Sequence, residues 1–282
     1  MDAGGNRHAR LPQTVETILF DFGGTLDADG VAWKERFHTL YQAEGLGMTA
    51  EAFASVFYAA DDPLVGGLPR NSGLDETVNA LAANLEAELG ARGDARLCHA
   101  REGGHPASAE TTLVMEAHLK RPLDPSFRRD DTHALAGRGA RVAKRFRSDA
   151  SGILARNRTA LEALAKRYRL GLVSNFYGNL EAVCDSAGLA PMFGVMADSQ
   201  CVGVEKPDPA LFRFALEALS ASPETTLFVG DSLSRDGEGA RRSGLSFVWI
   251  APRSAGPEAR AVGAGPVAAT IEDLPELLSL LK

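Results

Sequence analysis

The chain has 282 residues, of which 45% are apolar and 24% charged, and its formal net charge at pH 7 is −7. This length suits one large domain with an insertion, or two domains, and the composition is that of a globular protein with a sizeable core. The acidic balance argues against nucleic-acid binding, which needs a basic face. No segment approaches the roughly 18 consecutive apolar residues of a membrane span, so we expect no membrane partner.

Cysteine usage indicates the compartment. The three cysteines are Cys98, Cys184 and Cys201, widely spaced and outside any C-x-x-C pair. We therefore expect neither a disulfide framework nor a structural zinc site. The first residues also lack the apolar stretch of a signal peptide, and a reducing, cytoplasmic location is the expectation.

Four short apolar runs predict the strands of a parallel sheet. Each run is continuous rather than alternating, which is typical of strands buried on both faces. The runs cover residues 17–20, 169–175, 226–231 and 246–250. Helical patterns lie between the later runs, and this alternation predicts an α/β fold with a doubly wound, Rossmann-like parallel sheet and right-handed crossovers.

The middle of the chain has a different pattern. Apolar residues recur at helical spacing over residues 33–45, 50–62 and 74–93, and no convincing buried strand interrupts them. A turn-rich stretch over residues 93–110 predicts a surface loop, and the basic stretch 137–147 is interpreted as a solvated helix face. The middle is therefore predicted to be a helical insertion in the α/β core.

Four polar segments follow the predicted strands or lie between them. Taken singly, each could be a turn or a helix cap. In open parallel sheets, however, ligands bind at the carboxyl ends of the strands, and several of these segments fall there. The segments are D-F-G-G-T at 21–25, Ser174 with Asn175, Lys206 in VEKPDPALF, and Asp231 with Asp236 in GDSLSRD.

In this order and spacing, the four segments resemble the haloacid dehalogenase-like superfamily, whose members are mostly phosphohydrolases. The resemblance covers residues 16–30 and 156–244. It implies that the helical middle is a C1-type cap inserted just after the first motif. On this basis we expect residues 1–30 and 153–282 to form the core domain and residues 31–152 the cap domain. The expected partner is a small phosphorylated substrate, and nothing in the sequence predicts an oligomeric state.

The residue types suit phosphoryl transfer. A carboxylate attacks a phosphoryl group well when charge is screened and geometry is held, so Asp21 at a strand tip is the expected nucleophile. Thr25 and Ser174 would donate hydroxyl hydrogen bonds to the phosphoryl oxygens, and backbone N–H groups near Gly24 and Asn175 would add to that cradle. Lys206 would neutralise charge on both the phosphate and the nucleophile.

The last motif predicts a magnesium site. Mg²⁺ prefers oxygen ligands and typically takes one or two carboxylates together with a substrate phosphate, and Asp231 and Asp236 fit that preference. By resemblance, Asp21 and the backbone carbonyl of Gly23 are the other protein contacts of the metal.

Gly23 departs from the family pattern. In most phosphatases of the superfamily the residue two after the nucleophile is a second Asp, which protonates the leaving group and then activates water. Three interpretations stay open. The first is a slow phosphatase in which a good leaving group, a group of the substrate or another acid makes up for the missing Asp. The second is a dehalogenase- or phosphonatase-type hydrolase, and the third is a phosphate-binding or regulatory module. Asp27 and Asp29 are close in sequence, but they are expected to be turn and cap residues.

The two hydrolase branches that lack this Asp differ in the other residues that they need. The dehalogenases need no metal and lose the Gly-Asp of the last motif, which is intact here as Gly230–Asp231. The phosphonatases need a cap lysine that forms a Schiff base near the substrate. Lys34, Lys120 and Lys144 are candidates for that lysine by position only.

Overall fold

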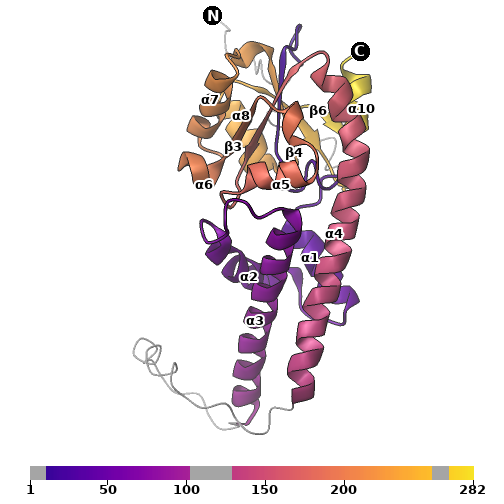
Figure 1. Ribbon diagram of the computed structural model, residues 1–282, viewed down its shortest axis with the longest axis vertical. Coiled ribbons are helices and arrows are strands. Elements are labelled where there is room, and N and C mark those ends of the chain that lie inside the picture. The colour runs from indigo at the N-terminus through magenta and orange to yellow at the C-terminus, as the bar shows by residue number, and fades with distance from the viewer. Residues whose placement is uncertain (1–10, 102–128, 256–266) are drawn as a thin grey trace, which may run out of the picture.

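The computed structural model describes residues 11–101, 129–255 and 267–282, with side chains for residues 11–93, 137–255 and 267–282. Figure 1 shows an α/β unit at one end of an elongated molecule and a helical insertion that extends away from it. Within the described residues, no helix combines the length and the hydropathy that a membrane crossing requires.

One six-stranded sheet forms the centre of the α/β unit. All its neighbouring strands pair in parallel, in the order β3-β2-β1-β4-β5-β6. The predicted parallel α/β fold is therefore confirmed. The strands are β1 (Thr17–Phe20), β2 (Arg169–Ser174), β3 (Val195–Asp198), β4 (Thr226–Gly230), β5 (Ser246–Ile250) and β6 (Val267–Ile271).

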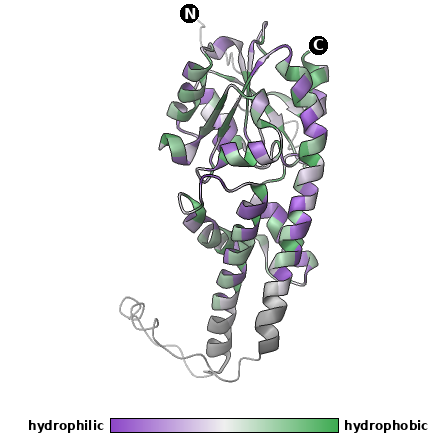
Figure 2. Ribbon diagram, in the orientation of Figure 1, coloured by the Kyte–Doolittle hydropathy of each residue, from purple (hydrophilic) through white to green (hydrophobic). Residues whose placement is uncertain are grey.

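Helices cover the sheet because its strands are apolar on both faces. In β1, Ile18 and Phe20 pack into one hydrophobic cluster, while Leu19 packs into a second cluster with Phe212 and Phe228. Figure 2 shows hydrophobic residues filling the strands, whereas the helices mix hydrophobic and hydrophilic residues. The core helices are α5 (Leu180–Ser186), α6 (Ser199–Val202), α7 (Pro209–Ala218), α8 (Glu238–Arg242) and α10 (Leu274–Leu280).

The insertion is helical, as predicted. Its elements are α1 (Trp33–Ala43), α2 (Ala50–Asp61), a 3₁₀ turn (Asp62–Leu64), α3 (Leu74–Arg101) and the first part of α4 (Arg129–Ala165). The predicted loop over residues 93–110 is wrong for residues 94–101, because α3 continues through them; the rest of that stretch lies outside the described residues. Packing of α3 along α4 gives the helix a partner that its sequence alone does not reveal.

Helix α4 joins the insertion to the core without a break. It packs on α1 and α3 in the insertion and on β2 and α10 in the core (Figure 1). The expected boundary between residues 152 and 153 falls inside this helix. The division into core and cap domains stays a prediction.

Aromatic side chains hold the insertion over the carboxyl edge of the sheet. The ring of Phe146 on α4 stacks on Phe37 at 4.5 Å and meets Trp33 edge-on at 5.1 Å. Trp33 in turn meets Phe176, which follows the tip of β2, at 6.1 Å. Such edge-to-face and stacked pairs fix geometry as well as burying apolar area. The start of α1 is therefore fastened to the loop after β2.

Candidate active site

Three adjacent strands deliver the polar groups of the site. Asp21, Ser174 and Asp231 end or follow β1, β2 and β4, which are neighbours in the sheet. The backbone N–H of Asp21 donates to the carbonyl of Val229 at 2.9 Å, so Asp21 continues the pairing of β1 with β4 and its side chain is rigidly presented. The predicted convergence at one edge of the sheet is present.

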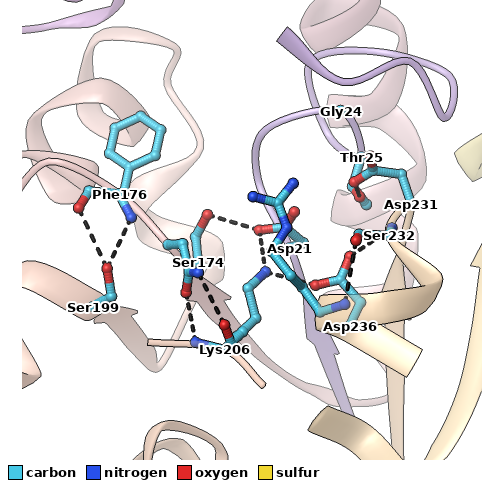
Figure 3. Close-up of polar contacts among 12 residues, drawn as sticks. Asp21, Gly24, Thr25, Ser174, Phe176, Ser199, Lys206, Asp231, Ser232 and Asp236 are labelled. Atoms are coloured by element: carbon cyan, nitrogen blue, oxygen red, sulfur yellow. Dashed lines mark hydrogen bonds and ion pairs between the residues drawn. The ribbon is translucent and has the colours of Figure 1, made fainter. Parts of the chain in front are cut away.

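Lys206 and Ser174 hold the carboxylate of Asp21. The Ser174 hydroxyl donates to Asp21 Oδ1 at 2.7 Å, and Lys206 Nζ lies 2.7 Å from that same oxygen (Figure 3). Lys206 also lies 2.7 Å from Asp236 Oδ1 and is buried. Burial alone would lower the pKa of Lys206, but the two carboxylates outweigh it and raise that pKa. The ammonium group therefore stays charged and links Asp21 to Asp236.

Asn175 orients the loop that carries Lys206. Its side-chain oxygen accepts from the backbone N–H of Lys206 at 2.7 Å, and its amide nitrogen donates to the carbonyl of Lys206 at 3.2 Å. Asn175 also lines the pocket above Asp21. The structure thus brings the second and third motifs together around the first.

Three carboxylates form a site with the chemistry of a hard-cation centre. One oxygen from each of Asp21, Asp231 and Asp236 lies within 4.8 Å of the others, and Asp236 is held by the backbone N–H of Ser232 at 2.9 Å. Burial, followed by repulsion from neighbouring carboxylates, raises the pKa of Asp231; burial also raises the pKa of Asp236 against the opposing pull of Lys206. An all-oxygen set with excess negative charge fits Mg²⁺.

The turn after β1 requires glycine at position 24. Gly24 has φ of +87°, and a β-carbon added there would come within 2.6 Å of Asp231 Oδ2. Its N–H donates to Asp27 Oδ1 at 2.8 Å, and the hydroxyl of the buried Thr25 donates to Asp231 Oδ1 at 3.1 Å. Both donors are thus engaged within the protein, and their assignment to the phosphate cradle stays a prediction.

Asp27 and Asp29 are each held by partners within the protein. Asp27 is fully buried, and its Oδ2 accepts from Trp33 Nε1 at 2.7 Å and from Arg36 Nη1 at 2.8 Å. Asp29 forms an ion pair with Arg156 on α4. Neither carboxylate lines the pocket above Asp21. The hydrogen bond from Gly24 N–H to Asp27 Oδ1 makes Asp27 a turn residue, as expected, but neither carboxylate caps α1, whose N-cap is Ala32.

A pocket of about 150 Å³ lies between the strand tips and the insertion. The core contributes Asp21, Gly23, Ser174, Asn175, Phe176, Tyr177, Lys206 and Arg235, and the insertion contributes Ala32, Trp33, Lys34, Glu35, Phe57, Tyr58 and Asp61. The volume admits a small substrate. Because the insertion supplies half of the lining, it is positioned to select what enters.

The sequence did not indicate several polar residues of this pocket: Glu35, Tyr58, Asp61, Tyr177 and Arg235. Arg235 lies within the last motif and Tyr177 three residues after Ser174, so proximity to a motif could have indicated them. Asp61 lies at the end of α2 and no motif accompanies it. The carboxylates of Asp21, Asp236 and Asp231 outweigh the effect of burial and raise the pKa of Arg235, which locates this guanidinium in their electric field.

The lysines considered as Schiff-base candidates differ in position. Lys34 lines the pocket, 3.4 Å from Glu35 and over the ring of Tyr58. Burial opposes its charge, but Glu35 and Tyr58 raise its pKa overall. Lys144 is exposed and outside the pocket lining, and Lys120 lies outside the described residues. In the basic stretch 137–147, Arg138 pairs with Glu86 and Arg141 with Glu44, so these arginines bind within the protein.

Comparisons with known proteins identify the family of the chain. The haloacid dehalogenase-like hydrolase family matches residues 15–244, and the chain belongs to that family. A phosphoserine phosphatase of Thermus thermophilus is 40% identical over 90 residues, which is 32% of this chain and 36% of that protein. The haloacid dehalogenase-like hydrolase domain-containing protein 3 of Bos taurus is 33% identical over 130 residues, 45% of this chain and 52% of that protein. The aligned part thus spans about a third to a half of these relatives.

A solved L-2-haloacid dehalogenase shares the fold. It aligns with a TM-score of 0.52 and 20% identity over 95% of this chain and 99% of that one. At this identity the likeness concerns the fold alone. The class of protein is therefore a hydrolase of the haloacid dehalogenase-like family with a helical insertion beside the site.

Proposed function

We propose that the protein is a magnesium-dependent phosphatase that acts on a small phosphomonoester through an aspartyl-phosphate on Asp21. The observation that carries this proposal is the bridge made by Lys206 between Asp21 and Asp236, beside a cluster of three carboxylates. A nucleophilic carboxylate next to a buried cation and an acidic metal site is the arrangement that phosphoryl transfer needs. The phosphoserine phosphatase among the relatives supports this class of reaction.

In this proposal each residue has a separate task. Asp21 Oδ attacks phosphorus while Ser174 and Asn175 orient the phosphoryl oxygens from the tip of β2. Lys206 offsets the charge of nucleophile and phosphate together. Asp21, Asp231, Asp236 and the carbonyl of Gly23 would hold Mg²⁺, which when bound supplies charge neutralisation to the phosphoryl group.

The helical insertion would serve as a C1-type cap. Residues 31–152 form it in this proposal, and residues 1–30 with 153–282 form the core. The pocket supports this role, because α1 and α2 line it opposite the strand tips. Gly23 makes the first motif a variant, D-F-G-G-T, without the usual second carboxylate.

The other open interpretations are less well supported. A metal-free dehalogenase has no use for the acidic cluster of Asp21, Asp231 and Asp236. A phosphonatase needs a lysine that is neutral enough to attack a carbonyl, whereas the pKa of Lys34 is raised. A binding module without turnover leaves the link between Lys206 and the nucleophile without a purpose.

A panel of phosphomonoesters, with Mg²⁺ or with EDTA, tests the proposal on the native protein and on Asp21→Asn. We expect phosphate release that requires both Mg²⁺ and Asp21, with a loss of at least about 1,000-fold in the variant, in keeping with removal of a covalent nucleophile. Turnover independent of Asp21 would contradict the mechanism. Halide release from a 2-haloacid in EDTA supports the dehalogenase branch, and borohydride trapping on Lys34 supports the phosphonatase branch.

A further inference from the structure

Gly23 leaves the proposed reaction without its usual proton donor, and the pocket contains a carboxyl that can take this role. We propose that Asp61, held in place by Tyr177, is the general acid and base of the reaction. The inference rests on the proposed phosphatase function and adds to it a cap residue that acts on the leaving group.

The first support is geometric. Asp61 is the last residue of α2 and lines the same pocket as Asp21. The phenol of Tyr177 donates to Asp61 Oδ1 at 2.5 Å, and Tyr177 lies on the loop after β2, three residues beyond Ser174. Among the described residues, Oδ2 of Asp61 has no hydrogen-bond partner. One oxygen is therefore anchored to the core, and the other is free to exchange a proton in the pocket.

The second support is the charge around Asp61. It is faced by Tyr177 from the loop after β2, by Asp62 from its own helix end, and by Arg235 from the turn after β4. Burial raises the pKa of Asp61 to about 6, with Asp62 acting in the same direction and Tyr177 and Arg235 in the opposite one. The C-terminal end of a helix also disfavours a carboxylate. Both protonation states are accessible near neutral pH, as acid–base catalysis requires.

Elimination gives the third support. Apart from the nucleophile, the carboxyls that line the pocket are Glu35 and Asp61. Glu35 is exposed and pairs with Lys34 at 3.4 Å. Asp27 is closed off by Trp33 and Arg36. Asp61 is therefore the lining carboxyl that is partly buried and that forms no salt bridge with a described side chain.

The proton balance of the two steps is complete. In the first, Asp21 Oδ forms a bond to phosphorus, the bond from phosphorus to the alkoxy oxygen breaks, and neutral Asp61 gives its proton to that oxygen. In the second, Asp61 carboxylate takes a proton from water, and the hydroxide so formed attacks phosphorus. The bond from phosphorus to Asp21 then breaks. The products are alcohol and phosphate, with Asp21 and Asp61 restored.

The test compares an alkyl phosphate with p-nitrophenyl phosphate at saturating Mg²⁺. An acidic nitrophenol leaves without protonation, whereas an alkoxide does not. We expect Asp61→Asn to lower kcat/KM for the alkyl ester by about 100-fold or more and that for the aryl ester much less, because proton transfer contributes roughly 100- to 10,000-fold. Glu51→Gln removes an exposed carboxyl from the first turn of the same helix, outside the pocket, and should leave both values near those of the native protein.

The outcomes separate the two proposals. If Asp61→Asn loses the same activity toward both esters, or loses none, the role of Asp61 is overturned. The proposed function still holds in that case, provided that the native protein releases phosphate. A native protein that releases phosphate from neither ester overturns the proposed function and this inference with it. Thermal unfolding of each variant shows whether a loss reflects misfolding, and Asp61→Glu should recover part of the alkyl activity.

The pH profile gives a second readout, on Tyr177→Phe. Because formation of the aspartyl-phosphate needs protonated Asp61, kcat/KM for the alkyl ester should fall as pH rises through about 6 in the native protein. The Tyr177 hydrogen bond lowers the pKa of Asp61, so its removal should move this fall to higher pH. Ionisation of the substrate affects the profiles of all variants equally, so it does not shift one profile relative to another. An unmoved profile overturns the inference.

Discussion

The indole of Trp33 lies against Gly23: a β-carbon added to Gly23 would stand 3.5 Å from Trp33 Nε1. That distance is an ordinary van der Waals contact, so the position can accept a small side chain. Trp33 is fixed by its hydrogen bond to Asp27 and by the ring of Phe146. The place of the usual second carboxylate is thus bordered by a rigid aromatic residue of the helical insertion.

This contact leads to a rescue experiment. If Asp61 already supplies the proton, Gly23→Asp in the native protein should change alkyl phosphatase activity by less than about threefold. In the Asp61→Asn background, Gly23→Asp should raise that activity by about tenfold or more, because a carboxyl returns near the leaving group. Steady-state kcat/KM measures both effects.

Gly23→Asn is the matched control for the rescue. It has nearly the same shape as Asp but cannot exchange a proton, so it should not rescue Asp61→Asn. Recovery with Asn as well as with Asp would mean that packing against Trp33, and not proton transfer, determines the effect.

Substitutions of Gly24 and Gly45 separate the effect of backbone strain from the effect of a steric clash. Both have positive φ, +87° and +89°, but a β-carbon on Gly24 would strike Asp231 whereas one on Gly45 meets nothing within 4 Å. Gly45→Ala should cost about 1–2 kcal/mol of unfolding free energy. Gly24→Ala should cost more and also abolish phosphatase activity. Urea unfolding and kcat/KM measure the two effects, and equal behaviour of the two variants would contradict the assigned contact.

The sequence predicted the parts of the fold that are buried on both sides. The runs at 17–20 and 246–250 match β1 and β5, since continuous apolar residues distinguish central parallel strands. The edge strands β3 and β6 were missed because their apolar runs, at 195–197 and 267–269, are short and contain alanine, which is depleted in strands. Half or more of the residues in each strand are only partly buried. Helix α3 passed its predicted end at Gly93 because packing on α4 outweighs the roughly 1 kcal/mol cost of a helical glycine.

The site was predictable wherever chemistry follows a strand. Asp21, Ser174 and Asp231 lie directly at strand tips. Lys206 was indicated by a motif of the family that the sequence resembles. Asp61 was not predictable, because its place in the same pocket as Asp21 depends on how the helices of the insertion pack together. Tertiary placement of this kind has no local signature in the chain.

Asp61 should also affect stability in a pH-dependent way. Its folded pKa of about 6 is above the ordinary value of 3.8, so the folded state binds the proton more tightly. The contribution of Asp61 to the free energy of unfolding is fully present below about pH 4 and is lost as pH rises through 6. Asp61→Asn, always neutral, should therefore be more stable than the native protein at pH 8, by about 1–2 kcal/mol.

Melting temperatures from pH 5 to pH 8 provide the measurement. The difference between Asp61→Asn and the native protein should shrink as pH falls, and Glu51→Gln, which removes an exposed carboxyl from the first turn of α2, should show no such trend. A variant less stable than the native protein at pH 8 would mean that Asp61 serves packing rather than proton transfer.

The acidic cluster predicts opposite effects of Asp231→Asn with and without metal. Asp21, Asp231 and Asp236 repel one another within 4.8 Å, so removing one charge should raise the melting temperature in EDTA. About 1 kcal/mol corresponds to roughly 2–4 °C in a domain of this size, and we expect a shift of that order.

Mg²⁺ should stabilise the native protein by mass action and the variant far less. Asp208→Asn, which changes the exposed cap of α7, is the control and should keep the Mg²⁺ response. A full Mg²⁺ response in Asp231→Asn would place the cation elsewhere.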